Sequence, residues 1–136
     1  ADEAAIFRAR AALADHQPLN ASTGAVRAAA LVSATGQIRL VREDIGRHNA
    51  LDKAIGSALM RRDGFNFGRS YVACTGRVSS DMALKCSVAG IPLVVSRGAT
   101  TSLAISIAQR TGLCIIGFLR GKRMTVYCHG HRLAMD

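Results

Sequence analysis

Residues 70–118 read SYVACTGRVSSDMALKCSVAGIPLVVSRGATTSLAISIAQRTGLCIIGF, and this stretch decides the fold. Three short apolar runs rich in β-branched residues, at 71–74, 92–95 and 113–118, predict strands that are covered on both faces. The two segments between them predict helices, because serine or threonine can cap each start and a glycine ends each one. Alternation of strands and helices at this spacing predicts right-handed crossovers and neighbouring parallel strands. We therefore expect an α/β fold.

Further elements are expected upstream. Residues 49–60 predict a helix with one continuous apolar face, made of Ala50, Leu51, Ala54, Ile55, Ala58 and Leu59. Residues 25–34 predict an Ala-rich turn of helix that runs into a strand, and residues 37–42 alternate as a hairpin partner of that strand would. In the second crossover helix, Leu103, Ile107 and Ala108 are expected to face inward.

Three basic loops are expected to meet at one edge of the sheet, because loops that leave parallel strands gather beside helix N-termini, whose free N–H groups attract anions. Each loop carries arginine and glycine, and two add hydroxyl groups. The loops contain Gly76, Arg77, Ser79 and Ser80; Arg97, Gly98, Thr100 and Thr101; and Arg120, Gly121, Lys122 and Arg123. Arginine offers a planar fork to phosphate oxygens, and glycine lets backbone N–H groups approach closely. The loops predict a phosphate or pyrophosphate pocket, and solvated turns are the alternative.

His48 and Asp52 are four residues apart, which places them side by side near the start of the helix at 49–60. Asp44 can join them from the preceding loop. A histidine backed by a carboxylate can orient a general base or a metal ligand. The alternative is a pair that only caps and braces the helix start.

The four cysteines, Cys74, Cys86, Cys114 and Cys128, form no CxxC motif. The first three fall within predicted strands or on a helix face, so they are expected to be small buried hydrophobes in a protein of the reducing cytoplasm. Metal binding by Cys128, His129 and His131 is not expected, because alternation along a strand points Cys128 and His129 to opposite faces.

The charge and the aromatic content of the chain indicate which kind of partner it binds. The chain has 136 residues and a net charge of +9, and 15 of its 18 basic residues are arginine. Residues 64–136 carry nine bases against only Asp81 and Asp136, so the half with the three loops bears most of the positive field. The partner is expected to be anionic: a nucleotide, a phosphorylated cofactor or a nucleic acid. With six aromatic residues there are few stacking platforms, so nucleic acid is the less favoured partner. No apolar run approaches a membrane span.

By length the chain is expected to hold one main domain. Residues 1–22 predict an N-terminal helix, at 2–14, and a linker, which together look like the remnant of a longer N-terminal part. Residues 23–136 predict the α/β domain that binds the ligand.

Three stretches carry a family resemblance. They are VREDIGRHNALDKAIG at 41–56, GRVSSDMALKCSVAGIP at 76–92 and GFLRGKRMTVY at 117–127, and in this order they resemble the formate dehydrogenase accessory protein family, FdhD. The resemblance implies a three-layer, cytidine-deaminase-like α/β sandwich with a mixed, largely parallel central sheet, usually as a homodimer. It also implies a sulfurtransferase that binds molybdopterin guanine dinucleotide, with GDP as an analogue, and passes sulfur to it from a cysteine desulfurase for formate dehydrogenase. The family's nucleotide-binding segment matches Phe118, Leu119, Arg120, Gly121, Lys122 and Arg123.

The chain departs from the family in its cysteines. The family's persulfide is carried by an upstream CxxC-type motif that is absent here, so the resemblance implies a C-terminal domain, and no cysteine of this chain inherits a catalytic role. The paired motifs of zinc deaminases are absent as well, so neither deamination nor a metal is expected. The candidate cofactor site therefore comprises the six residues of 118–123 together with Arg77, Ser79, Arg97, Thr100, His48 and Asp52. A basic nucleic-acid-binding module is the alternative function.

Overall fold

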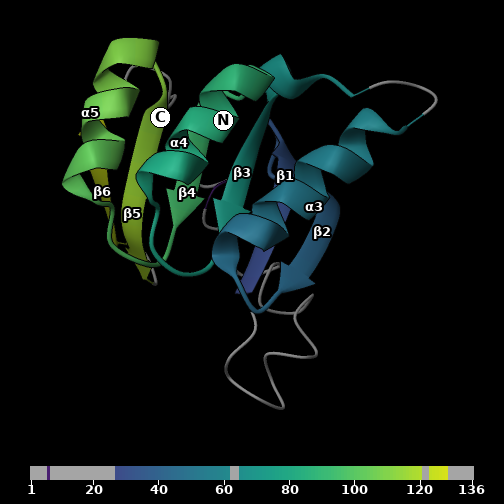
Figure 1. The fold of residues 1–136 in the computed structure, drawn as a ribbon, viewed down its shortest axis with the longest axis horizontal. Coiled ribbons are helices and arrows are strands. Elements are labelled where there is room, and N and C mark those ends of the chain that lie inside the picture. Colours follow the sequence, from purple (N-terminus) through teal and green to yellow (C-terminus); the bar gives the residue numbers. More distant parts are fainter. Residues whose placement is uncertain (1–5, 7–26, 62–64, 121–122, 129–136) are drawn as a thin grey trace.

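The computed structural model describes residues 6, 27–61, 65–120 and 123–128; for residues 47, 48, 118–120, 123, 124 and 128 only the backbone is described. A mixed sheet of six strands forms its centre, in the order β2-β1-β3-β4-β5-β6 (Figure 1). The strands are β1 (Arg27–Ser33), β2 (Ile38–Asp44), β3 (Ser70–Cys74), β4 (Leu93–Ser96), β5 (Cys114–Arg120) and β6 (Arg123–Cys128). The β3–β4 and β4–β5 pairs are parallel, and the other three pairs are antiparallel. The expected α/β fold with a mixed central sheet is confirmed, and two of its five strand pairs are parallel.

Three helices cover one face of this sheet (Figure 1). They are α3 (Arg47–Leu59), α4 (Ser80–Ala89) and α5 (Ser102–Thr111), and a short 3-10 helix, η1 (Phe67–Arg69), leads into β3. The predicted stop signals are confirmed, because Gly90 and Gly112 end α4 and α5 in the left-handed conformation, with φ of 82° and 80°. Thr101 caps α5 by accepting a hydrogen bond from the Ala104 N–H at 3.2 Å.

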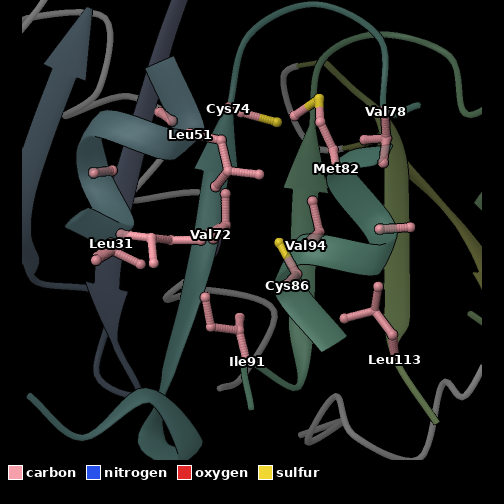
Figure 2. Packing of buried hydrophobic residues seen from close by; sticks show 14 of the residues in the cluster. Leu31, Leu51, Val72, Cys74, Val78, Met82, Cys86, Ile91, Val94 and Leu113 are labelled. Atoms are coloured by element: carbon pink, nitrogen blue, oxygen red, sulfur yellow. The ribbon is translucent and has the colours of Figure 1, made fainter. Parts of the chain in front are cut away.

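The core has two parts, one on each face of the sheet, because strand residues alternate between the faces. On the helix face, Leu51 of α3 and Met82 of α4 pack with Val72 and Val94 of the sheet (Figure 2). The opposite face gathers Ala28, Ala30, Val32, Tyr71, Ala73, Leu93, Val95, Cys114 and Ile116 around Ile6. Ile6 is helical and 1% exposed, and it is the one described residue of the helix predicted at 2–14.

The Ala-rich segment was predicted as a turn of helix running into a strand, and its described part differs. Residues 27–33 are strand throughout, paired antiparallel with β2 on one side and β3 on the other. Because β1 is a central strand buried on both faces, small alanine side chains fit there, and sheet packing overrides their helical propensity. The hairpin prediction for residues 37–42 is confirmed. The predicted domain boundary between residues 22 and 23 lies outside the described residues.

Two inward-facing predictions are wrong. Leu103 of α5 is 62% exposed and Leu59 of α3 is 69% exposed, while Ala104 and Ala108 are fully buried. The helical period gives the direction of the buried face but not its width, and both leucines stand at its margin. Leu59 lines a groove of about 780 Å³ between α3 and α4, together with Asp52, Ile55, Gly56, Phe67, Asp81, Leu84, Lys85, Val88 and Ala89. Among the described helices, none is long and apolar enough to cross a membrane.

Candidate functional site

The loops that follow β3 and β4 meet at one edge of the sheet, the lower edge in Figure 1, where α4 and α5 also begin. We call this the loop edge. Backbone hydrogen bonds join the two loops: the Val78 N–H donates to the Ala99 carbonyl at 2.9 Å, and the Thr101 N–H donates to the Val78 carbonyl at 3.0 Å. The predicted convergence of the first two basic loops is therefore present in the fold.

Gly98 allows these loops to touch. A Cβ at this position would lie 2.6 Å from the Gly76 oxygen and 2.7 Å from the Gly76 carbonyl carbon. Ser96, the last residue of β4, reinforces the contact, because its buried hydroxyl donates to the Gly76 carbonyl and accepts from the Gly98 N–H. Both glycines belong to the predicted basic loops, whereas Ser96 was not predicted to take part. Its position at the end of a buried apolar strand could have indicated this contact, since a buried hydroxyl needs hydrogen-bond partners.

The strand that leads to the third loop also reaches this edge. A Cβ at Gly117 of β5 would lie 3.1 Å from the Gly98 oxygen and 3.3 Å from the Thr100 Oγ1. Gly117 was missed as a site residue, although a glycine inside an apolar strand run signals a close approach. Beyond it, the pairing of Arg120 with Arg123 brings β5 and β6 together around the third loop. Residues 121 and 122 and the side chains of Phe118, Leu119, Arg120 and Arg123 lie outside the described structure, so their assigned roles stay predictions.

The remaining loop residues suit an anionic ligand. Arg77 and Arg97 are both exposed, and neither forms an ion pair with any described residue. The Thr100 Oγ1 is buried and has no hydrogen-bond partner in the described chain, so it is an orphaned polar atom beside the glycine contacts. Ser79 is the N-cap residue of α4, and its side chain makes no capping bond. Guanidinium groups, a spare hydroxyl and a helix N-terminus together form a set that a phosphate group would satisfy.

A second group of polar residues lies at the same edge, where β2 ends and α3 begins. Lys53 Nζ lies 2.6 Å from a carboxylate oxygen of Asp44, and the other carboxylate oxygen accepts from the Gly46 N–H at 3.1 Å. The hydrogen bond from Lys53 is the main reason that the pKa of Asp44 falls below its ordinary value, and the Gly46 N–H lowers it further. Asp44 thus braces the start of α3.

The predicted pair of His48 and Asp52 is only partly visible. Asp52 forms an ion pair with Lys85 of α4 and lines the groove between α3 and α4. The side chain of His48 lies outside the described structure, although its backbone starts α3 at the loop edge. The pair therefore stays a prediction, and the ion pair shows that Asp52 also links two helices.

The cysteines behave as the sequence predicted where they are described. Cys74, Cys86 and Cys114 form no disulfide with a described residue, and each is 3% exposed or less. Burial raises the pKa of Cys86 far above its ordinary value, and the neighbouring Cys74 adds to this shift. A covered thiol is a poor nucleophile, so the burial of these three sulfurs favours a packing role. Within the residues that the structure describes, no group of His, Cys, Asp and Glu could hold a metal ion; His129 and His131 fall outside them.

The fold and the loop edge define an α/β domain built on a mixed six-stranded sheet, and comparison with known proteins gives the family. The chain belongs to the FdhD/NarQ family, whose model matches residues 1–134. It is 47% identical over 132 residues to the sulfur carrier protein FdhD of Xanthomonas euvesicatoria pv. vesicatoria (strain 85-10), which covers 97% of this chain and 46% of that protein. It is 44% identical over 129 residues to the sulfur carrier protein FdhD of Variovorax paradoxus (strain S110), covering 95% of this chain and 46% of that protein.

A solved structure supports the fold. A crystal structure of a protein from Desulfotalea psychrophila, assigned as a formate dehydrogenase accessory protein, superposes with a TM-score of 0.89 at 34% identity. The match covers 98% of this chain and 56% of that protein. This chain therefore spans about half the length of the curated relatives it matches. The family predicted from the three sequence stretches is confirmed.

Proposed function

We propose that this chain is the cofactor-holding part of a cytoplasmic sulfurtransferase that prepares molybdopterin guanine dinucleotide for formate dehydrogenase. The observation that carries the proposal is the loop edge itself. Two loops are fixed to each other by backbone contacts, and each presents an exposed arginine without a described carboxylate partner. The buried Thr100 hydroxyl of the second loop has no hydrogen-bond partner among the described residues. The names of the relatives supply the sulfur-carrier context.

In this proposal different residues bind different parts of the ligand. Arg77 and Arg97 bind phosphate oxygens, because a guanidinium can donate two parallel hydrogen bonds to one phosphate. Thr100 donates its free hydroxyl to the same group, and Ser79 and the N-terminus of α4 face its negative charge. The third loop, from Phe118 to Arg123, holds the guanine nucleotide as the family resemblance implies. The bound cofactor supplies the metal that receives sulfur.

The sulfur itself comes from a cysteine other than Cys74, Cys86 and Cys114, because all three thiols are buried. A persulfide carrier must be reached by its donor, which in this proposal is a cysteine desulfurase, and then by the cofactor. In this proposal the chain holds the acceptor, and the carrier cysteine is the upstream CxxC-type motif that the family resemblance implies, in a homodimeric assembly of the whole protein.

The proposal is tested by calorimetric titration with GDP, with ADP as the competing nucleotide. We expect saturable binding that favours GDP. Arg97→Ala is expected to weaken GDP binding by about 1.5–3 kcal/mol, roughly tenfold to 150-fold, because it removes a charge-assisted hydrogen bond to phosphate. Arg110→Ala is the matched control, since Arg110 is an exposed arginine in the last turn of α5, away from its capped N-terminus at the loop edge.

Two results would reject the proposal. Equal binding of GDP and ADP would remove the guanine assignment, and unchanged GDP binding by Arg77→Ala and Arg97→Ala would remove the loops from the site. Tight binding of single-stranded RNA with a steep loss of affinity as salt rises would favour the nucleic-acid-binding module instead.

A further inference from the structure

A basic pocket lies at the edge of the sheet opposite the loop edge. It encloses about 340 Å³ where β1 ends and β3 begins, and we call it the far-edge pocket. Its lining residues are Ser33, Ala34, Thr35, Arg39, Phe65, Asn66, Arg69 and Ser70. The ladder of β1 and β3 pairs Ser33 with Ser70, so the floor of the pocket is part of the sheet. None of the family motifs quoted above includes these residues.

Positive charge gathers here without a described counter-charge. Arg39 and Arg69 both line the pocket, both are exposed, and neither forms an ion pair with a residue the structure describes. Arg61 adds a third guanidinium beside them, because it donates to the Arg39 carbonyl at 3.0 Å and lies 5.6 Å from the centre of the Phe65 ring. Like charges held together repel, and a bound anion would relieve that repulsion.

The hydrogen-bonding groups of the pocket also favour an anion. The Ser33 and Thr35 hydroxyls bond each other at 2.9 Å, and the Ser70 hydroxyl donates to the Asn66 carbonyl at 2.8 Å. The two guanidinium groups can only donate, and the Asn66 side-chain amide adds an NH2 donor beside its carbonyl acceptor. A ligand made of acceptors, such as phosphate, matches that set.

One wall of the pocket is aromatic. Phe65 is half-buried and is braced by Phe67, with the ring centres 5.1 Å apart. A braced ring beside arginine side chains offers a surface for another planar ring. A volume of about 340 Å³ is at the small end of ligand pockets, which suits one nucleotide rather than two.

We propose that the far-edge pocket binds a mononucleotide, with its phosphate on Arg39 and Arg69 and its base against Phe65. This site is separate from the loop edge and from the function proposed there. It would give the domain a second nucleotide-binding site at the other end of its strands.

The test is an amide NMR titration of this chain with AMP, because the two sites report through different residues. AMP is expected to shift the amide signals of residues 33–39 and 65–70. The double variant Arg39→Ala/Arg69→Ala is expected to weaken these shifts at least about tenfold, and Phe65→Leu to reduce AMP binding to the level of inorganic phosphate. Arg110→Ala is the control for loss of an exposed positive charge that does not line the pocket. Both arginines are exposed, so the double variant is expected to keep a folded spectrum.

Three outcomes would overturn the inference. AMP could leave residues 33–39 and 65–70 unshifted, the double variant could bind AMP like the parent, or inorganic phosphate could bind as tightly as AMP. A single-stranded oligonucleotide that binds more than about tenfold tighter than AMP, with shifts along the whole of β2, would assign the pocket to a nucleic-acid strand and reject the mononucleotide. Signals of residues 76–79 and 97–101 report separately on the loop edge, so either proposal can fail alone.

Discussion

The two edges of the sheet hold their polar groups in different ways. At the loop edge the backbone does the holding, through hydrogen bonds between Val78 and Ala99 and the contact of Gly98 with Gly76. At the far edge the polar surface is made of long arginine side chains around Phe65. The first arrangement is fixed by the fold and tolerates no added atoms, while the second can lose a side chain and leave the fold intact. A substitution at the glycine contact of the loop edge should therefore lower stability and binding together. Substitution of an arginine at the far edge should weaken binding and leave stability unchanged.

The largest expected effect is at the glycine contact. Gly98→Ala is expected to lower the free energy of unfolding by about 2–3 kcal/mol, because the new Cβ would meet backbone atoms of Gly76 and the Arg77 nitrogen, 2.9 Å away, that cannot move independently. Urea unfolding of the parent and the variant measures this difference. GDP binding should weaken together with stability, since the same contact aligns both loops.

The matched control is Gly56→Ala in α3. A Cβ at Gly56 would meet nothing within 4 Å, so alanine should raise the stability by about 0.5–1 kcal/mol through its better helical propensity. If Gly98→Ala proves as stable as the parent, the contact of Gly98 with Gly76 does not hold the two loops together. The two edges would then not differ in the way described above.

The next expected effect is on the rate at which a thiol reagent reacts with the buried cysteines. Cys128→Ala leaves the three buried thiols as the only cysteines, and we expect them to react with a thiol reagent on the order of 100-fold more slowly in the native chain than in urea. Absorbance kinetics with a disulfide reagent measure both rates. Cys74 is the informative residue, since it ends β3 at the loop edge. Rapid native labelling of Cys74, located by peptide mapping, would mean that the loop edge opens readily.

The sequence predicted the loop edge well where local signals suffice. Alternating strands and helices placed the loops of Arg77 and Arg97 on one edge, and Gly90 and Gly112 marked the helix ends. It could not find the contact of Gly98 with Gly76, because that contact depends on how two crossovers pack. It failed at Leu59 and Leu103 for a related reason: an apolar residue at the margin of a helix face is covered only if a neighbour reaches it.

The far edge shows what sequence patterns miss altogether. Arg39, Arg61 and Arg69 come from separate segments, and each by itself resembles an ordinary solvated arginine. The pairing of β1 with β2 and β3 brings Arg39 and Arg69 to one pocket, and a hydrogen bond to the Arg39 carbonyl holds Arg61 near Phe65. A site made of side chains from distant segments leaves no local motif, whereas loops that follow parallel strands do.

The smallest expected effect is at Asp44, where the loop edge uses side-chain charge instead of backbone contacts. The Lys53 ammonium and the Gly46 N–H favour the ionised carboxylate in the folded state, so the pKa of Asp44 is lower folded than unfolded. The stabilisation is therefore fully present above the unfolded value and is lost as pH falls through the folded pKa. Asp44→Asn keeps the side-chain size and an acceptor for Gly46 but removes the charge. The parent should be the more stable protein above about pH 5, and the difference should shrink progressively as the pH falls below that value.

Urea midpoints measured across this pH range test the prediction, and Lys53→Met provides the control because it removes the main cause of the shift. That variant should lose stability above about pH 5 as Asp44→Asn does, and the difference from the parent should shrink in acid in the same way. A difference between parent and Asp44→Asn that stays constant down to about pH 3 would mean that the carboxylate acts only as a hydrogen-bond acceptor. The loop edge would then be held by neutral contacts along its whole length, and charge would matter only to its ligand.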